Sequence, residues 1–491
     1  MNNIEKSKKN YDEVPYKSIS FPETHPLNQK IILGLLGFET PETEKARILE
    51  IGCSFGGNLI PFALNNKEAD VIGIDLSEYQ INEGKKIVEK MGIKNLKLYP
   101  INILEYNNEF GKFDYIICHG VFSWVPEIVQ EKILKVVKEG LVENGSAVIS
   151  YNTYPGWKKL DILKDMMNFR ENIFQKSSSE NMADGKIEKR IGRGKETLGL
   201  FEKFSNIIDD DFKETIKIVK NKENHYLYHE YFESDNNPLY LQEFNEKLLN
   251  NDLIHICDTT LSKSFIADNR LELEEHISSE CKDNNILREQ YYDFIYNRQF
   301  RSSIITHKNN FEKVRLNGSV SIEKLLKYHI RKKINSEARY DDETTLLGYI
   351  DEKYPDTVPI EEIFIKFKES IPELVMYIFS GEIEVYDKEI KTVRSQKTKL
   401  KDNYRKYIKT YLKLKDDIIN FSNFIGEEVL IDKSFMSIML EFDGKKTKEE
   451  IVEIIIKELK NNNEQDKNIK EILYELVENI ENIIISNLMN E

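Results

Sequence analysis

Polar residues and glycines that could bind a ligand occupy five alternate positions, in the pattern Glu50-x-Gly52-x-Ser54-x-Gly56-x-Asn58. The pattern follows a short apolar run and precedes apolar residues at helical spacing, which predicts a strand, a tight turn and a helix. Glycine is needed where the backbone takes a positive φ or where a ligand lies against it. We therefore expect a ligand-binding turn at the end of this strand.

A second predicted strand ends in Asp75, roughly 20 residues after the turn, where a carboxylate can accept both hydroxyls of a ribose. The turn lacks the Gly-x-Gly-x-x-Gly spacing, and no Gly-Lys-Ser/Thr follows it, which excludes a P-loop. An acidic side chain at the strand end, without a basic residue that could bind phosphate, suits a cationic ligand that carries no phosphates. S-adenosylmethionine fits that description, and an ordinary turn without a ligand is the alternative.

Composition indicates a globular chain of several domains. Its 491 residues predict two to four domains, and 40% apolar residues allow sizeable cores. The net charge of −15 argues against nucleic acid as a partner. We find no apolar run of about 18 residues and no signal peptide, so we expect no membrane association and a cytoplasmic location. The spacing of the four cysteines indicates neither a disulfide framework nor a metal site.

Strand and helix patterns alternate after the first predicted strand, which favours an α/β fold with a doubly wound, parallel sheet. Ligands bind such sheets at the carboxyl ends of the strands. Two later strands, 253–257 and 301–306, would complete seven strands, the last of them antiparallel. The earlier elements are predicted as strands 46–51, 70–75, 96–101, 113–118 and 146–151, and helices 57–65, 78–91 and 127–140.

The same patterns divide the chain into regions. Residues 1–45 form an arm with aromatic residues and prolines that could fold back as a lid. Residues 46–308 form the ligand-binding domain, with a helical insertion at 171–235. Within it, the polar stretch 175–195 could be a mobile loop, and a solvated run of charged residues is the favoured alternative. Residues 309–390 form a middle domain. A C-terminal domain, 391–491, begins with a basic stretch that we interpret as a surface linker.

Several motifs together resemble one known family. Besides the turn and Asp75, they are His119-Gly-Val-Phe-Ser-Trp-Val-Pro126, Tyr151-Asn-Thr-Tyr-Pro-Gly-Trp157, Tyr292-Asp-Phe-Ile-Tyr-Asn-Arg-Gln-Phe-Arg301 and Phe442-Asp-Gly-Lys-Lys-Thr447. They resemble class I methyltransferases that carry a methyltransferase regulatory domain, over nearly the whole chain. The best-known relatives are rickettsial-type lysine methyltransferases that act on outer-membrane proteins. The resemblance implies S-adenosylmethionine as the cofactor and a seven-stranded class I sheet, with a helical insertion and additional α+β C-terminal domains.

The resemblance also assigns donor binding to the turn and to the ends of the neighbouring strands. Ser54 holds a place where glycine is commoner, and we expect its hydroxyl to face solvent. Asn102 lies where many class I enzymes place an acid, and its side-chain carbonyl could accept from the adenine amino group instead. The predicted donor-binding residues are Tyr16, Glu50, Gly52, Cys53, Ser54, Gly56, Asn58, Asp75, Leu76, Asn102, Ile103 and His119.

Methyl transfer from a sulfonium mainly requires alignment of the acceptor and exclusion of water. A lysine acceptor must lose a proton first, from a pKa near 10.4, and desolvation in an aromatic channel lowers that pKa. His119 could be a base, a donor contact or a turn residue, and we favour the contact. Packing at a helix start is the alternative role for Tyr154 and Trp157. The predicted catalytic residues are His119, Tyr151, Asn152, Tyr154 and Trp157.

The resulting hypothesis is an S-adenosylmethionine-dependent methyltransferase acting on lysine side chains of a protein, such as an outer-membrane or surface protein. A small-molecule methyltransferase and a cofactor-binding scaffold without activity are the alternatives, and a homodimer is left open. His225 and His229 lie four apart on a predicted helix without a third ligand, so we expect no metal and place this tract beside the substrate. We assign the C-terminal domain to acceptor recognition and predict that donor binding survives its deletion.

Overall fold

The computed structural model describes the chain except for its amino-terminal end and several short segments. Within the described ranges, no helix combines the length and the apolar character that crossing a bilayer requires. Tyr16, a predicted donor contact, lies outside the described residues. These are residues 17–177, 186–203, 209–233, 235–265, 271–282, 284–316, 320–333, 342, 344–393, 395–414, 418–459, 467–487 and 489.

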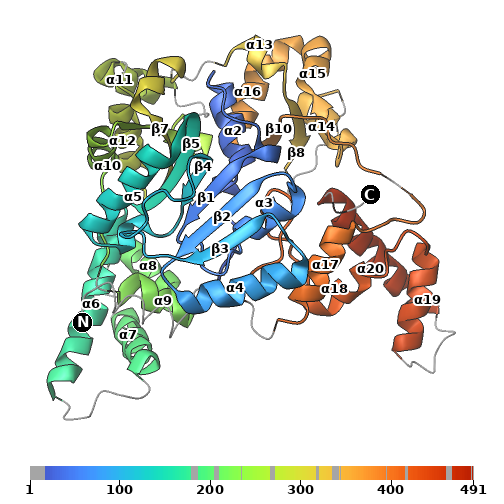
Figure 1. Ribbon diagram of the computed structural model, residues 1–491, viewed down its shortest axis with the longest axis horizontal. Coiled ribbons are helices and arrows are strands. Elements are labelled where there is room, and N and C mark those ends of the chain that lie inside the picture. Colours follow the sequence, from blue (N-terminus) through green and yellow to red (C-terminus); the bar gives the residue numbers. More distant parts are fainter. Residues whose placement is uncertain are drawn as a thin grey trace.

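A seven-stranded sheet forms the centre of the molecule, in the order β3-β2-β1-β4-β5-β7-β6 (Figure 1). Its strands are parallel from β3 to β5, and β7 pairs antiparallel with both β5 and β6. The predicted doubly wound fold with an antiparallel last strand is therefore confirmed. The strands are β1 (Arg47–Ile51), β2 (Asp70–Asp75), β3 (Leu96–Pro100), β4 (Phe113–Cys118), β5 (Leu141–Asn152), β6 (Leu253–Asp258) and β7 (Phe300–His307).

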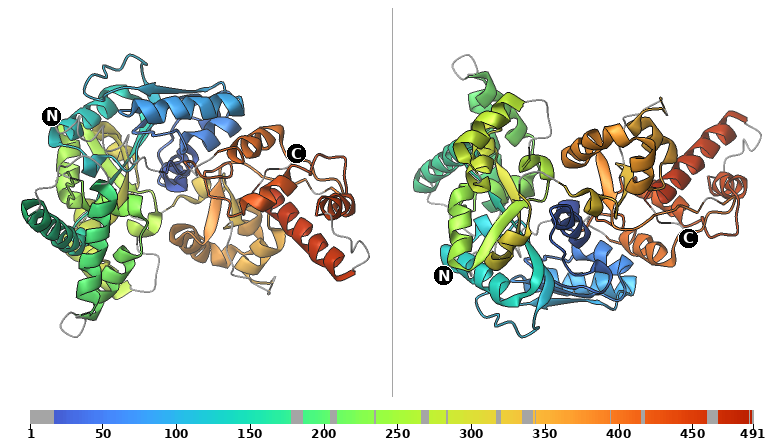
Figure 2. Two further views of the ribbon diagram at one scale, coloured as in Figure 1. Left: turned by 90° about the horizontal axis from the view of Figure 1, so that it is seen from below. Right: turned by 90° about the horizontal axis from the view of Figure 1, so that it is seen from above.

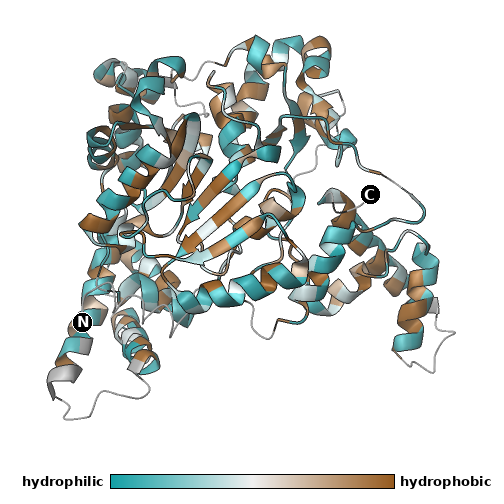
Figure 3. Cartoon of the chain, viewed as in Figure 1, coloured by the Kyte–Doolittle hydropathy of each residue, from teal (hydrophilic) through white to brown (hydrophobic). Residues whose placement is uncertain are grey.

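Successive side chains of a strand point to opposite faces, so neighbouring residues enter different cores. Ile48 of β1 belongs to the core that includes α3 (Leu59–Asn65) and α4 (Glu78–Met91). Leu49 belongs to the core that includes α5 (Glu127–Gly140). Hydrophobic residues consequently run through the central strands (Figure 3). Burial on both faces explains why these strands have nearly continuous apolar sequences.

The helical insertion comprises α6 (Trp157–Ser177), α7 (Lys186–Lys203), α8 (Asp210–Lys220) and α9 (Asn224–Tyr231). These helices share a small core of their own, to which the first turns of α6 contribute. The insertion therefore begins with α6 at Trp157, and the predicted start at residue 171 is wrong, because α6 is one continuous helix. The mobile-loop interpretation is wrong for the second half of 175–195, which belongs to the helix α7. The alternative interpretation, a solvated run of charged residues, fits Glu188 and Lys189, which are exposed on this helix. Residues 178–185 of that loop lie outside the described residues.

Three helices flank the last two strands of the large sheet: α10 (Leu241–Asn250) precedes β6, and α11 (Leu271–Cys281) and α12 (Asn285–Ile295) lie between β6 and β7. The middle region forms a smaller antiparallel sheet in the order β10-β8-β9. Its elements are α13 (Ile322–Leu325), β8 (His329–Lys332), α14 (Leu346–Lys353), β9 (Val358–Pro359), α15 (Ile360–Lys366), α16 (Ile371–Ser380) and β10 (Ile383–Tyr386).

The amino-terminal arm is only partly available as a lid. Its helix α2 (Pro26–Leu35) shares a core with the middle region and with residues of β6 and β7. Leu33 and Leu35 of α2 are almost completely buried in that core. The prediction of one arm over residues 1–45 is therefore wrong from α2 onward, because the apolar residues of α2 pack against the middle region, β6 and β7.

The C-terminal helices are α17 (Asp402–Tyr411), α18 (Lys433–Met439), α19 (Lys448–Glu458) and α20 (Lys467–Ser486). They lie at the opposite end of the molecule from the insertion (Figure 2). Their apolar residues form one continuous core with α3, α4 and the sheet, and α17 contacts α4 directly. The predicted surface linker is wrong where it reaches α17, because the side chains of Tyr404 and Tyr407 are fully buried. The C-terminal region is thus part of the sheet's cover. This shared core replaces the expectation that donor binding survives deletion of residues 391–491.

Candidate active site

A cavity of about 690 Å³ lies at the carboxyl ends of β1, β2 and β4, where a doubly wound sheet places its ligands. We call the part beside these strand ends the donor end. The acceptor end is the part lined by α9, the start of α6 and the segment that enters β7. The cavity is lined by these predicted residues: Glu50, Gly52, Cys53, Ser54, Asn58, Asp75, Leu76, Asn102, Ile103, His119, Asn152 and Trp157.

The turn after β1 has the backbone that its residue types predict. Gly52 has a φ of 80°, and a Cβ there would lie 2.3 Å from Cγ2 of Val121. Ser54 also adopts a positive φ, 52°, which is uncommon for a residue other than glycine. The Ser54 hydroxyl does not face solvent as predicted: it is buried and has no hydrogen-bond partner among the described groups. Gly56 shapes the turn with a φ of 82° but is absent from the cavity lining.

Asp75 joins this turn to the end of β2. Its Oδ2 accepts a hydrogen bond from the Ser54 backbone N–H at 2.8 Å, and its Oδ1 accepts from the Ser77 N–H at 2.9 Å. The residue lines the cavity, and a carboxylate oxygen can accept more than one hydrogen bond. Asp75 can therefore hold the turn in place and still accept hydroxyl groups of a ligand.

Glu50 is a buried carboxylate at the end of β1. Its Oε1 accepts from Nδ2 of Asn58 at 2.8 Å, whereas its Oε2 is buried without a partner in the described part of the chain. Burial, reinforced by the negative charge of Asp75, raises the pKa of Glu50 to about 8. A buried carboxylate that lacks a partner is costly unless a ligand supplies one. Its position fits the ammonium group of S-adenosylmethionine.

Asn58 also connects the donor end to the amino-terminal arm. Its Oδ1 accepts from the Phe21 backbone N–H at 2.8 Å, and its Nδ2 donates to Oγ1 of Thr24 at 3.1 Å. Phe21 lines the cavity, and its ring centroid lies 3.9 Å from that of His119. The residues just before α2 thus form one wall of the donor end.

His119 follows β4 and is suited to contact a ligand rather than to act as a base. Burial lowers the pKa of His119 to about 4, so its imidazole is neutral near pH 7 and a weak proton acceptor. Its Nδ1 is buried and lacks a hydrogen-bond partner among the described residues. Asn102 also lines the cavity, and its Oδ1 accepts from the Leu104 N–H at 3.1 Å with a lone pair to spare.

Two of the predicted catalytic residues lie outside the cavity lining. Tyr151 is buried in the core, where its ring stacks on that of Phe244 at a centroid distance of 4.1 Å. Its neighbour Asn152 points to the other face of β5 and lines the cavity, as strand alternation requires. The Tyr154 hydroxyl donates to the Asp161 carboxylate at 3.1 Å, and Tyr154 is absent from the cavity lining. The predicted role of Tyr151 and Tyr154 as acceptor contacts is therefore wrong.

The acceptor end contains residues that were not among the predicted site residues. Trp124, Tyr226 and Glu230 line it, as do Gln299 and Phe300 at the start of β7. Tyr226 and Glu230 belong to the histidine-containing tract predicted to lie beside the substrate, and their spacing of four residues on one helix is a signal that could have identified them. The two tryptophans pack edge to face, with ring centroids 6.1 Å apart.

The two histidines of that tract have different surroundings. His225 lines the cavity, and its Nδ1 lies 3.2 Å from the Glu223 carboxylate. His229 is buried with Glu233, its Nδ1 3.4 Å from that carboxylate. They therefore do not face a common ligand. No group of three or more candidate metal ligands occurs among the described residues.

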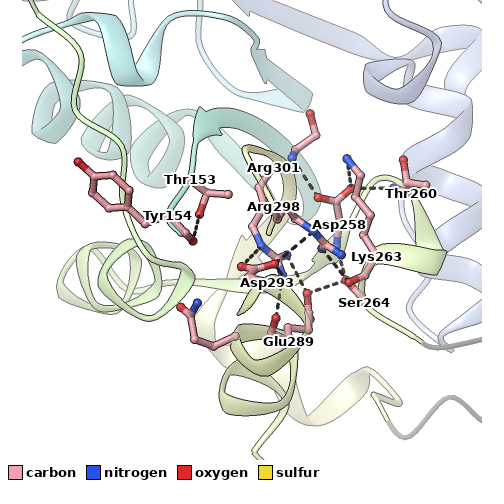
Figure 4. Close-up of polar contacts among 12 residues, drawn as sticks. Thr153, Tyr154, Asp258, Thr260, Lys263, Ser264, Glu289, Asp293, Arg298 and Arg301 are labelled. Atoms are coloured by element: carbon pink, nitrogen blue, oxygen red, sulfur yellow. Dashed lines mark hydrogen bonds and ion pairs between the residues drawn. The ribbon is translucent and has the colours of Figure 1, made fainter. Parts of the chain in front are cut away.

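A buried polar network supports the wall formed by β7 (Figure 4). The Arg301 guanidinium donates to both oxygens of Asp293, at 2.8 Å each, and to Oε2 of Glu289 at 2.9 Å. Gln299, just before β7, accepts with its backbone oxygen from the Thr153 N–H at 2.9 Å. The network and this bond fix the start of β7 against the end of β5. The wall of the cavity is therefore built on a rigid support.

The fold and the site define a class I S-adenosylmethionine-dependent methyltransferase, and comparison with known proteins agrees. Residues 42–204 match the family described as "Methyltransferase domain", and residues 223–307 match that described as "Predicted methyltransferase regulatory domain". The solved structure of PKMT2 from Rickettsia typhi in complex with AdoHcy is similar with a TM-score of 0.79 and 25% identity. The similarity covers 97% of this chain and 100% of that chain.

Two relatives come from Rickettsia prowazekii. Uncharacterized protein RP789 is 36% identical over 325 residues, or 65% of this chain and 56% of that protein. Uncharacterized protein RP028 is 38% identical over 245 residues, or 50% of this chain and 96% of that protein. The chain thus matches little more than half of RP789 and nearly all of RP028. It belongs to the class I methyltransferases with a methyltransferase regulatory domain, and its cofactor is S-adenosylmethionine.

The buried Glu50 makes donor binding depend on pH. In the free site this carboxyl has a pKa of about 8, and an ammonium bound beside it lowers that pKa. Below pH 8 the Glu50 carboxyl must release its proton when the ligand binds. We therefore expect the affinity for S-adenosylhomocysteine to rise between pH 6 and 8, by at most about tenfold per pH unit, and to level off above pH 8. Calorimetry across this range measures the slope. Glu50→Gln should bind weakly without such a slope, and an equal slope in this variant would contradict the assignment.

Proposed function

We propose that this chain transfers the methyl group of S-adenosylmethionine to a lysine side chain of a protein. The observation that supports it best is the acceptor end of the cavity, which is lined by the aromatic residues Trp124, Trp157 and Tyr226 and by a carboxylate, Glu230. Aromatic faces and a carboxylate together suit a cationic amine on an apolar stem. The PKMT2 structure, whose whole length is matched, contains AdoHcy, the product left by such a donor.

The donor supplies a methyl group already activated on its sulfonium sulfur, so the protein's task is to position the acceptor and to exclude water. Glu50, Asp75 and Asn102 would hold the donor, and His119 with Phe21 would cover it. Asn152 and Trp157 also line the cavity and would guide the amine. Desolvation in this apolar passage lowers the pKa of the lysine ammonium and favours the neutral amine that attacks.

The test is incubation with methyl-labelled S-adenosylmethionine and three acceptors: poly-L-lysine, extracted outer-membrane proteins and small primary amines. Label on lysine residues, identified by mass spectrometry after digestion, supports the proposal. Label confined to the small amines would indicate a small-molecule methyltransferase instead. Binding of S-adenosylhomocysteine without label in any acceptor would favour a cofactor-binding scaffold.

A further inference from the structure

Glu230 presents a carboxylate to the acceptor end that has no hydrogen-bond or ion-pair partner in the described part of the chain. Three other acids that line the cavity have hydrogen-bond or ion-pair partners. Glu50 accepts from Asn58, Asp75 accepts from two backbone N–H groups, and Glu223 lies 3.2 Å from His225. Glu230 differs from these three acids because no hydrogen bond or ion pair involves either of its carboxylate oxygens in the described part of the chain, whereas Glu50 lacks a partner only at Oε2.

The helix that carries Glu230 is held firmly. Leu227, Tyr228 and Tyr231 of α9 are buried in the core of the insertion. Tyr226 and Glu230 lie one helical turn apart, on the face that lines the cavity. A carboxylate and an aromatic ring are thus fixed side by side at the end opposite the donor-binding turn.

We propose that Glu230 receives the ammonium group of the acceptor lysine and removes its proton before methyl transfer, with Tyr226 as the neighbouring aromatic contact. This inference rests on the proposed function. In the step, one N–H bond of the ammonium breaks and its electron pair stays on nitrogen, while an O–H bond forms on the carboxylate. The neutral amine is then the nucleophile. Transfer of the proton from Glu230 to solvent restores the carboxylate.

The surroundings of Glu230 suit a base that works near neutral pH. Burial raises the pKa of Glu230 to about 8, and the positive charges of Lys164 on α6 and Lys222 before α9 limit the rise. Tyr226 and Tyr231 are the other titratable groups of the described chain that face it. A carboxyl with a pKa of about 8 is closer in pKa to the lysine ammonium, near 10.4, than an ordinary carboxyl is. Transfer of the proton from the ammonium to this carboxylate therefore costs less free energy. His119, with a pKa of about 4, is a poorer acceptor.

The test compares Glu230→Gln with the wild-type protein, using poly-L-lysine as the acceptor. We expect kcat/KM at pH 7.5 to fall about 100-fold, the lower range for loss of a general base. The activity of Glu230→Gln should recover as the pH is raised toward 10, because the amine then loses its proton without help. Affinity for S-adenosylhomocysteine and the melting temperature should stay unchanged, which a misfolded or donor-deficient variant would not show.

Glu214→Gln is the matched control, since it removes one carboxylate from the exposed surface of the neighbouring helix α8. It should behave as the wild type. If Glu230→Gln retains wild-type kcat/KM and pH dependence on lysine, the inference about Glu230 is wrong and the proposed function stands. A wild-type protein that labels no lysine would overturn both. Loss of activity without recovery at high pH would show that Glu230 positions the acceptor but does not take its proton.

Discussion

A chain that ends at residue 390 is expected to lose its donor site together with its fold. Truncation would remove α17 to α20, whose apolar residues form one core with α3 and α4 beneath the sheet. Burying a large apolar side chain contributes about 1.5–3 kcal/mol, and the whole domain is held by about 5–15 kcal/mol, so exposing many such residues exceeds the margin. We expect an aggregating product without a cooperative thermal transition or affinity for S-adenosylhomocysteine.

The C-terminal region also holds the arm that closes the donor end. The Ser18 N–H donates to the Ile418 oxygen at 2.7 Å, and Ser20 donates from its N–H to Oδ1 of Asn420 at 3.0 Å. Asn420→Ala keeps the core and removes one anchor of the arm. The Asn420 side chain bonds both the N–H and the hydroxyl of Ser20. The variant should fold normally and bind S-adenosylhomocysteine about tenfold more weakly, because the arm is held less firmly. A truncated chain that folds and binds like the full chain would instead show that the C-terminal region is a separable domain.

Asp75→Ala is expected to abolish measurable donor binding while leaving the chain folded. If its carboxylate accepts both ribose hydroxyls, the variant loses two charge-assisted hydrogen bonds of about 1.5–3 kcal/mol each. Affinity for the donor should then fall at least about 100-fold. It also frees the backbone N–H groups of Ser54 and Ser77, so the turn should loosen. Calorimetry with S-adenosylhomocysteine measures the affinity.

Asp75→Asn separates the two contributions, because an amide keeps one acceptor oxygen and the size of the side chain. Its affinity should lie between those of Asp75→Ala and the wild type. A thermal melt checks that each variant is folded. Wild-type affinity in a folded Asp75→Ala protein would show that the ribose is bound elsewhere in the cavity.

Local sequence determined the sheet and the donor end of this protein. Apolar runs followed by glycines specify strands and turns through backbone conformation alone, so residue types and spacing suffice to place the turn at Gly52 and the acid at Asp75. Parallel strands bring their carboxyl ends to one edge, which gathers residues distant in sequence, such as Glu50 and Asn102, around one cavity.

Tertiary structure alone decided the acceptor end and the role of the C-terminal region. Tyr151 and Asn152 are adjacent, and only the pairing of β5 with β7 settles which of them faces the cavity. Glu230 lies about 180 residues beyond the turn, on a helix whose direction depends on how the insertion packs. The burial of Tyr404 and Tyr407 depends on α4, far away in sequence. Long-range packing of this kind leaves no local periodicity, so the sequence by itself could not reveal it.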